Sequence, residues 1–210
     1  MFRNFLNILL FYILIFQICY CLSDNTEQNA TLKCEKLLIA NRVPKLSSCV
    51  EAAGNSRRNG IYSIQIQNLD DLKVFCVEDV DFGGWLVIQR RQNDSVDFYR
   101  NWMDYKEGFG DLTGNYWIGL EKLHALTRDC EQELYIQLKR SNGMEYYAKY
   151  REFVIAAESE SYALKKLGKY SGDAGDSLRI HLGMKFSTYD RDNGIYEENC
   201  AEIFKGAWWF

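Results

Sequence analysis

The sequence predicts an α+β fold built mainly on an antiparallel sheet. The first observation is a series of alternating apolar segments, separated by short turns, that have the pattern of strands. The second is that helical segments fall between groups of strands and do not alternate strictly with them. The third is composition, because 47% hydrophobic and 15% aromatic residues in 210 are enough for a sizeable core.

The elements follow from local patterns. A short helix is expected at 48–53, and Asn59–Gly60 then turns the chain into the first strand of the domain. A helix over 98–102 is expected after a cap at Ser95 or Asp97, and a second helix at 120–126 has apolar residues three or four apart. Asn142–Gly143 predicts a hairpin turn. Strands are expected at 61–66, 72–77, 85–90, 133–140 and 145–152.

The N-terminal residues 1–22 have the pattern of a signal peptide. Arg3 precedes an apolar stretch, and small side chains at Cys19 and Cys21 suit a cleavage site. The alternative is an uncleaved anchor, because the apolar stretch approaches membrane-spanning length. Either way the remainder faces the outside, so we expect a secreted, extracellular protein. Residues 23–45 are expected to form an N-terminal arm, followed by one domain at 46–210.

Charge and motif content exclude several functions. The formal net charge is −4, and no basic stripe is available to neutralise phosphates, so nucleic acid and acidic membranes are not expected as partners. The sequence has only two histidines and lacks a nucleophile elbow, a phosphate-binding glycine loop and a zinc-spaced Cys/His cluster. We therefore expect no enzymatic activity.

Cysteines and sequons fit an extracellular chain. Of seven cysteines, loss of Cys19 and Cys21 leaves five, so one thiol stays free or bridges to another chain in a disulfide-linked oligomer. Two sequons, at Asn29 and Asn93, are candidate glycosylation sites in a secreted protein.

Several sequence blocks resemble one family over most of the chain. They include SCVEA at 48–52, NGIYSI at 59–64, GGWLVIQRR at 83–91, YWIGLEKLHALT at 116–127 and GMKFST at 183–188. Their order and spacing are similar to the fibrinogen C-terminal domain, which occurs in fibrinogen chains, ficolins, tachylectins and angiopoietins. The resemblance implies a fibrinogen-like globular domain whose C-terminal subdomain is incomplete at residue 210, so that much of the family's ligand pocket would come from later residues.

The resemblance also implies a disulfide between Cys49 and Cys76. The family counterpart of Cys200 pairs with a cysteine shortly after the paired tryptophans, and here the sequence ends at Phe210. The partners of Cys34, Cys130 and Cys200 therefore stay open at this point.

An acidic loop near the C-terminus resembles the family's calcium site. The resemblance implies a carboxylate ligand at Asp192, a second ligand position at Gly194, and backbone carbonyl ligands from Tyr196 and Glu198. Glycine supplies no carboxylate at position 194, so calcium binding is expected to be weak. The alternative is a solvated acidic turn that holds no metal.

Phe204 occupies a position where the family often has an aromatic pocket wall, and the alternative for this residue is plain core packing. The first functional hypothesis is a secreted, lectin-like protein that binds acetylated glycans in innate immunity, with weak affinity for N-acetylated sugars because the pocket is incomplete. The second is an extracellular receptor ligand or adhesion protein without lectin activity. The third is a truncated family member that binds nothing.

Overall fold

The computed structural model describes residues 8–17, 46–66 and 71–210. Among these residues, nine strands form one sheet with the path β11-β8-β7-β1-β4-β3-β2, to which β5 and β6 are joined through β4. The strands of the path are β11 (Tyr170–Gly172), β8 (Glu145–Tyr150), β7 (Gln132–Arg140), β1 (Ile8–Gln17), β4 (Trp85–Arg91), β3 (Leu72–Val77) and β2 (Gly60–Ile64).

The remaining elements lie around this sheet. Two further strand pairs are β9 (Phe153–Ile155) with β10 (Leu164–Leu167), and β12 (Phe186–Ser187) with β13 (Trp208–Trp209). The short strands beside β4 are β5 (Phe109–Gly110) and β6 (Tyr116–Trp117). The helices are α2 (Cys49–Ala53), α3 (Trp102–Glu107), α4 (Leu120–Arg128), α5 (Cys200–Phe204) and the 3-10 turns η2 (Glu158–Glu160) and η3 (Arg179–His181).

Each strand pair in these sheets is antiparallel, which confirms the predicted α+β class. The hairpin between β7 and β8 forms where Asn142–Gly143 predicts it. Gly143 has φ +82°, a left-handed conformation that glycine adopts without strain, and its N–H donates to the carbonyl of Arg140 at 2.9 Å.

The disulfide between Cys49 and Cys76 is confirmed. It joins the start of α2 to β3, with a Cα–Cα distance of 5.5 Å. Helix α2 begins there because the Ser48 hydroxyl accepts a hydrogen bond from the N–H of Glu51, as in a standard N-cap. Both cysteine side chains are buried, so the bridge is part of the core.

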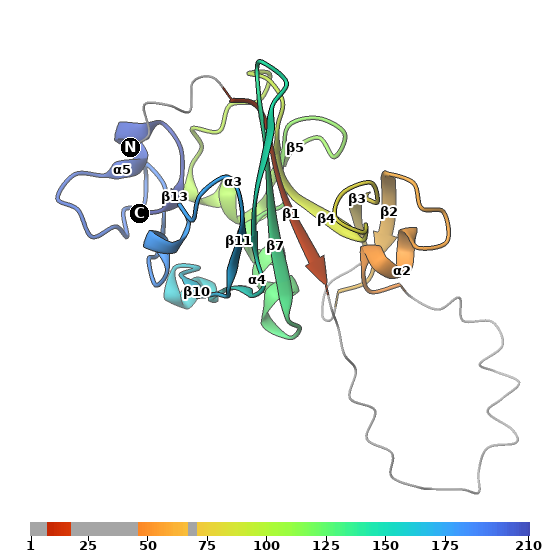
Figure 1. The fold of residues 1–210 in the computed structure, drawn as a ribbon. Coiled ribbons are helices and arrows are strands. Elements are labelled where there is room, and N and C mark those ends of the chain that lie inside the picture. The colour runs from red at the N-terminus through yellow and green to blue at the C-terminus, as the bar shows by residue number, and fades with distance from the viewer. Residues whose placement is uncertain (1–7, 18–45, 67–70) are drawn as a thin grey trace, which may run out of the picture.

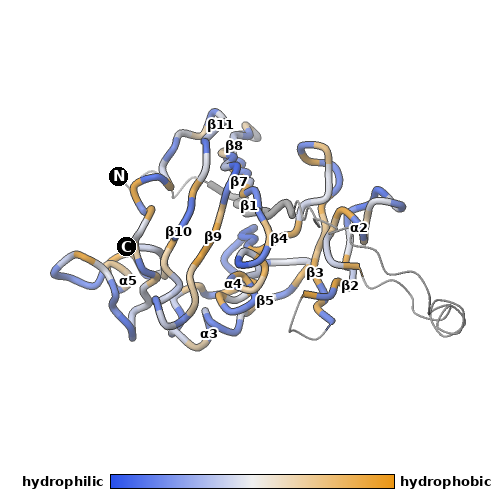
Figure 2. Tube along the Cα trace, turned by 90° about the horizontal axis from the view of Figure 1, so that it is seen from below, coloured by the Kyte–Doolittle hydropathy of each residue, from blue (hydrophilic) through white to orange (hydrophobic). Residues whose placement is uncertain are grey.

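Aromatic side chains dominate the core next to the C-terminal segment. The ring of Phe186 lies 5.4 Å from that of Tyr105, 6.3 Å from that of Trp117 and 5.1 Å from that of Trp209, measured between centroids. These rings come from α3, β6, β12 and β13, so they join the C-terminal strand pair to the central sheet. Figure 2 shows the hydrophobic character of β3 and β9 and the more hydrophilic loops around them.

The helix expected over 98–102 is wrong. Residues 98–101 are not helical, and α3 begins at Trp102 after an N-cap at Asn101, whose side chain accepts from the N–H of Asp104 at 2.8 Å. The carboxylate of Asp97 accepts from the N–H of Tyr99 at 2.8 Å and so stabilises a turn in place of a helix start.

Some predictions fall outside the described residues. They concern the arm at 23–45, the sequon at Asn29 and Cys34. Cys130 is disulfide-bonded, and Cys200 carries a free thiol. Among the helices that the structure describes, none combines the length and apolarity needed to cross a bilayer.

Candidate functional site

The candidate site is the segment 188–204, which follows β12 and consists of the acidic loop and α5. It lies at the end of the molecule away from α2, β2 and β3, with the central sheet between them (Figure 1). The loop begins and returns at the β12–β13 pair, where Phe186 faces Trp209 and Ser187 faces Trp208. Because Phe186 and Trp209 are buried, the base of the loop is fixed to the core.

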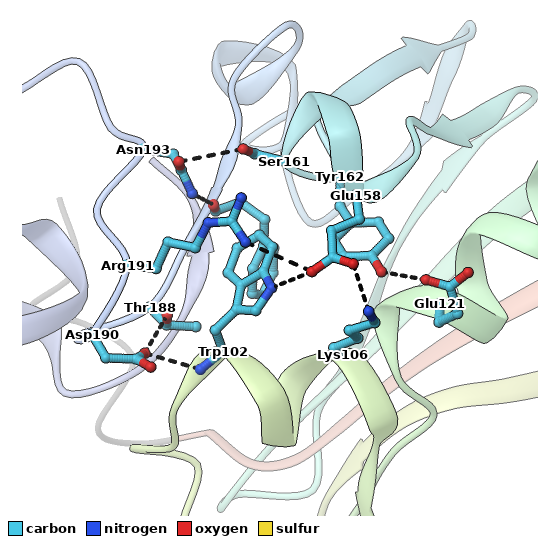
Figure 3. Close-up of polar contacts among 11 residues, drawn as sticks. Trp102, Lys106, Glu121, Glu158, Ser161, Tyr162, Thr188, Asp190, Arg191 and Asn193 are labelled. Carbon is cyan, nitrogen blue, oxygen red and sulfur yellow. Dashed lines mark hydrogen bonds and ion pairs between the residues drawn. The ribbon is translucent and has the colours of Figure 1, made fainter.

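Asp190 ties the first part of the loop to α3. One carboxylate oxygen accepts from the backbone N–H of Trp102 at 2.9 Å and from the hydroxyl of Thr188 at 2.7 Å (Figure 3). The N–H of Trp102 belongs to the first turn of α3 and has no partner within the helix. The contact therefore satisfies a helix terminus and holds the loop against it.

A second contact, which we call the Trp102 clamp, consists of Trp102, Lys106, Glu158 and Arg191. The Arg191 guanidinium lies 3.9 Å from the centre of the Trp102 ring, and the indole N–H donates to Glu158 at 2.9 Å (Figure 3). The Lys106 ammonium and the Arg191 guanidinium lie 2.5 Å and 3.7 Å from the Glu158 carboxylate. The hydrogen bond from Lys106, followed by that from Trp102, lowers the pKa of Glu158 below its usual value.

Two asparagines complete the support of the loop. The Asn193 side chain donates to the carbonyl of Phe186 at 2.7 Å, and its oxygen accepts from the Ser161 hydroxyl at 3.3 Å (Figure 3). The Asn199 side chain donates to the carbonyls of Thr188 and Tyr189, both at 3.1 Å, while its oxygen caps α5. The two ends of the loop are thus held by side-chain hydrogen bonds.

The middle of the loop and α5 carry exposed apolar side chains. Ile195 is 67% exposed, Tyr196 63%, Ile203 53% and Phe204 49%. We call these four residues the C-terminal surface. The half-exposed Phe204 is not a core residue, although one side of its ring stacks on that of the buried Phe210 at 6.0 Å. Trp209 and Phe210 are buried, as the core-packing alternative expects.

The predicted calcium residues contribute only one suitable side chain. Asp192 is exposed, and its Oδ1 already accepts the N–H of Gly194 at 2.9 Å. Among the residues that the structure describes, no group of three or more His, Cys, Asp and Glu side chains is placed to hold a metal ion. The side chains present do not fit the set of carboxylates that calcium prefers, and calcium binding stays a prediction.

Substituting Gly194 by Asp tests this assignment. A Cβ added at position 194 would lie 3.2 Å from Oδ1 of Asp192, so the new carboxylate would stand beside the existing one. Two adjacent carboxylates attract a hard cation, and we expect calcium to raise the melting temperature of Gly194→Asp more than that of the wild type. Gly194→Asn is the matched control, because it adds the same bulk without charge. Equal calcium responses in all three proteins would contradict the assignment.

Cys200 is the first residue of α5 and follows the acidic loop in the chain. Partial burial, and then the nearby carboxylates of Asp192 and Glu198, raise the pKa of its thiol. The thiol is therefore mainly protonated at neutral pH and is a weak nucleophile. A disulfide-linked oligomer through Cys200 remains a proposal and needs an oxidant to form.

Asn93, the predicted glycosylation site within the described residues, is exposed on a turn. Its side-chain oxygen accepts from the N–H of Ser95 at 3.0 Å and from the buried Asn115 at 2.7 Å. The side chain is thus held by hydrogen bonds within a surface turn, and glycosylation there stays a prediction.

A surface concavity lies away from the acidic loop. Its volume is about 490 Å³, and its described lining includes Phe75, Asp79, Arg90, Lys139 and Glu145. Lys139 and Glu145 pair with each other at 2.8 Å, and Arg90 lies over the Phe75 ring at 4.3 Å. Because Lys139 and Glu145 pair with each other and Arg90 is engaged by Phe75 and the Leu112 carbonyl, we keep the C-terminal segment as the candidate site.

Sequence reasoning missed the Trp102 clamp. Trp102 and Glu158 lie 56 residues apart, and Trp102 and Asp190 lie 88 apart, so no local pattern connects them. It also missed the left-handed pair Ser161 and Tyr162, at φ +53° and +47°. This conformation directs the Tyr162 carbonyl to the indole N–H of Trp209 at 2.7 Å.

The fold and the exposed, supported loop define a binding domain. The chain belongs to the family described as the C-terminal globular domain of fibrinogen beta and gamma chains, which matches residues 46–210. This is a family of non-enzymatic binding domains.

Individual relatives agree with this assignment. Human angiopoietin-related protein 1 is 44% identical over 153 residues, which are 72% of this chain and 31% of the relative. Fibrinogen-like protein A of Apostichopus parvimensis is 44% identical over 168 residues, 79% of this chain and 58% of the relative. The chain thus spans about a third of the length of the angiopoietin-related protein that it matches.

Solved structures share the fold. The fibrinogen-like globe domain of human ANGPTL2 has a TM-score of 0.76 at 41% identity, covering 79% of this chain and 77% of that one. The lamprey fibrin D-dimer, solved with the peptide ligand Gly-His-Arg-Pro-amide, has a TM-score of 0.71 at 33% identity and covers 90% of this chain and 62% of that one.

Proposed function

We propose that this protein is an extracellular recognition protein that binds a partner protein through the C-terminal surface. The observation that carries the proposal is the exposure of Ile195, Tyr196, Ile203 and Phe204 on a loop and helix whose backbone is held in place. Exposed large apolar side chains on a loop and on the helix that directly follows it are candidates for an interaction site. A loop that is already ordered loses less conformational entropy when it binds.

The charges around this surface indicate the chemistry of the partner. Glu197, Glu198 and Glu202 are exposed and neighbour the apolar residues in the chain, where they outnumber the exposed Lys205. An apolar centre with an acidic rim is complementary to a protein surface with an apolar centre and a basic rim. The lamprey relative solved with a peptide ligand supports a peptide or protein partner for a domain of this fold.

The predicted signal peptide and the disulfide support an extracellular location. The Cys49–Cys76 bridge is expected to persist in an oxidising compartment. Similarity to angiopoietin-related proteins supports an extracellular binding partner.

Binding of acetylated glycans is a second candidate. Phe204 presents a half-exposed ring beside Phe210, and an aromatic face of this kind suits the methyl group of an acetyl substituent. The proposal includes no calcium step, because the described side chains do not fit a calcium site.

Cell-surface binding with matched variants tests both candidates. We expect Tyr196→Ala combined with Phe204→Ala to weaken binding of the labelled protein to responsive cells at least about tenfold, because central aromatic side chains carry much of an interface's binding energy. Phe82→Ala is the control, since Phe82 is fully exposed on the turn between β3 and β4.

A glycan-binding experiment distinguishes a protein partner from an acetylated glycan. Retention on an acetylated-glycan resin, with elution by N-acetylglucosamine, supports the lectin activity in place of a protein partner. If the double variant binds cells as strongly as the wild type, the placement of the site is contradicted. Absence of binding to cells and to the resin alike would support the non-binding alternative.

A further inference from the structure

The side chain of Tyr196 is freely accessible on the acidic loop. It is 63% exposed, and among the residues that the structure describes its hydroxyl has no hydrogen-bond partner and its ring has no stacking partner. Residues 195–198 form bends and belong to no helix or strand. A phenol on a segment of this kind can enter the cleft of a modifying enzyme while the domain stays folded.

The charged residues next to Tyr196 in the chain are mostly acidic. Three exposed carboxylates and one cation lie within five positions of it: Asp192, Glu197, Glu198 and Arg191. The cation is already engaged, because its guanidinium lies 3.9 Å from the centre of the Trp102 ring and 3.7 Å from the Glu158 carboxylate (Figure 3). Negative charge therefore prevails around the phenol.

We propose that Tyr196 is a tyrosine-sulfation site, modified by a sulfotransferase during passage through the secretory pathway. The phenolic oxygen attacks the sulfur of a phosphosulfate nucleotide, and an O–S bond forms at the tyrosine. The bond between sulfur and the bridging oxygen of the nucleotide breaks, so that the nucleotide leaves as its phosphate. The phenolic proton passes to a base of the enzyme.

Electrostatics explain why the acidic neighbours matter for this reaction. A sulfotransferase binds an anionic nucleotide, so cations are expected to line its cleft. Such a cleft attracts an acidic segment and repels a basic one. Glu197 and Glu198 follow the phenol directly, and both are exposed, so they can contact the cleft when the hydroxyl reaches the sulfur.

Tyr147 provides a contrasting case within the same protein. Among the tyrosines that the structure describes, only Tyr147 and Tyr196 are exposed, at 38% and 63%. The Tyr147 ring stacks on that of Tyr135 at 5.4 Å, and its strand β8 pairs with β7. Its nearest carboxylate in the chain, Glu145, pairs with Lys139 at 2.8 Å. Tyr147 thus lacks the accessibility and the local negative charge of Tyr196.

A sulfate at Tyr196 changes the chemistry of the C-terminal surface. It adds a negative charge and further acceptor oxygens beside Glu197 and Glu198, much as phosphorylation does. Arginine side chains bind such oxyanions through paired N–H groups, so the partner is expected to present arginines. This consequence rests on the proposed function of the surface, whereas the modification itself requires only passage through the secretory pathway.

Mass spectrometry of the full chain, recovered from the medium of secreting cells, tests the modification. We expect the peptide that contains Tyr196 to carry a sulfate that is lost in acid and resists phosphatase, and the peptide that contains Tyr147 to carry none. Chlorate blocks synthesis of the phosphosulfate nucleotide, so growth in chlorate should remove the group. An unmodified Tyr196, or a group that phosphatase removes, would overturn the proposal.

A charge variant tests why this tyrosine is selected. Glu197→Gln combined with Glu198→Gln should lower sulfate occupancy about fivefold, because it removes the attraction to a basic cleft. Glu202→Gln is the matched control, since this exposed carboxylate lies beyond the five neighbouring positions and should leave occupancy unchanged. Equal occupancy in the charge variant and the wild type would overturn the assigned recognition. If the variant is not secreted, purified full chain treated with a sulfotransferase and radiolabelled nucleotide gives the same comparison.

Cell binding separates this inference from the proposed function. On untreated cells, protein made in chlorate should bind about fivefold more weakly than sulfated protein, because it lacks one charge toward a basic partner. Equal binding of the two would overturn the assigned role of the sulfate. An unsulfated protein whose binding still depends on Tyr196 and Phe204 overturns the modification and leaves the proposed function standing. A sulfated protein whose binding ignores both side chains supports the modification and contradicts the proposed surface.

Discussion

Trp102→Ala should lower the free energy of unfolding by about 3–5 kcal/mol, the range for removal of a buried tryptophan. The Trp102 side chain is buried, and its ring lies 5.7 Å from that of Tyr162 and 6.4 Å from that of Phe186. Its loss also removes the indole N–H from Glu158 and the ring on which Arg191 lies. Urea unfolding gives the free energy, and hydrogen exchange of residues 188–199 reports the loop.

Two control variants separate packing from the clamp. Trp102→Phe keeps an aromatic ring and removes the indole N–H. Its free energy of unfolding should therefore fall less than that of the alanine variant. Arg191→Ala leaves the core intact and should increase exchange of the loop with little change in global stability, since Arg191 is partly exposed. A Trp102→Ala protein within 1 kcal/mol or so of the wild type would contradict the account of the clamp.

Removal of the Cys49–Cys76 disulfide should be the second large effect. In the double variant Cys49→Ala/Cys76→Ala, the unfolded chain regains the freedom of a loop whose ends are 27 residues apart. The entropic estimate for that loop length is about 3.5 kcal/mol of lost stability. Thermal or urea unfolding measures the loss, and peptide mapping without reduction checks the linkage.

Cys200→Ser is the control for this prediction. Cys200 carries a free thiol, so its replacement should leave the free energy of unfolding close to that of the wild type. Recovery of Cys49 and Cys76 as separately alkylated peptides from secreted protein would contradict the bridge. So would a double variant as stable as the wild type.

Local signals in the sequence were sufficient for much of the fold. Ser48 caps α2, and Asn142–Gly143 forms the β7–β8 turn, because each feature depends on neighbouring residues. The predicted helix cap at Ser95 or Asp97 is wrong, because the Asp97 side chain suits a turn equally well and accepts the N–H of Tyr99 there. The Cys49–Cys76 pairing came from the family resemblance, which carries long-range information that periodicity lacks.

The resemblance predicts Asp192, Gly194 and Phe204 as site residues, and that assignment stays a prediction. The contacts that hold the loop come from Trp102 and Glu158, which are distant in the chain and which no sequence pattern indicates. Segment Ile8–Gln17 shows a different limit, since one apolar pattern suits both a signal peptide and a strand in the middle of a sheet. Which of the two roles the segment takes depends on tertiary packing and on whether signal peptidase removes it.

The central claim is that the C-terminal surface contacts an extracellular partner protein. Photo-crosslinking on living cells measures this most directly, with a photoreactive amino acid placed at Tyr196 in one protein and at Phe82 in another. Both side chains are exposed, but only Tyr196 belongs to the C-terminal surface. We expect Tyr196 to give a discrete cross-linked protein band that unlabelled wild-type protein suppresses, while Phe82 gives none. Equal labelling from the two positions, or labelling from Phe82 alone, would contradict the account.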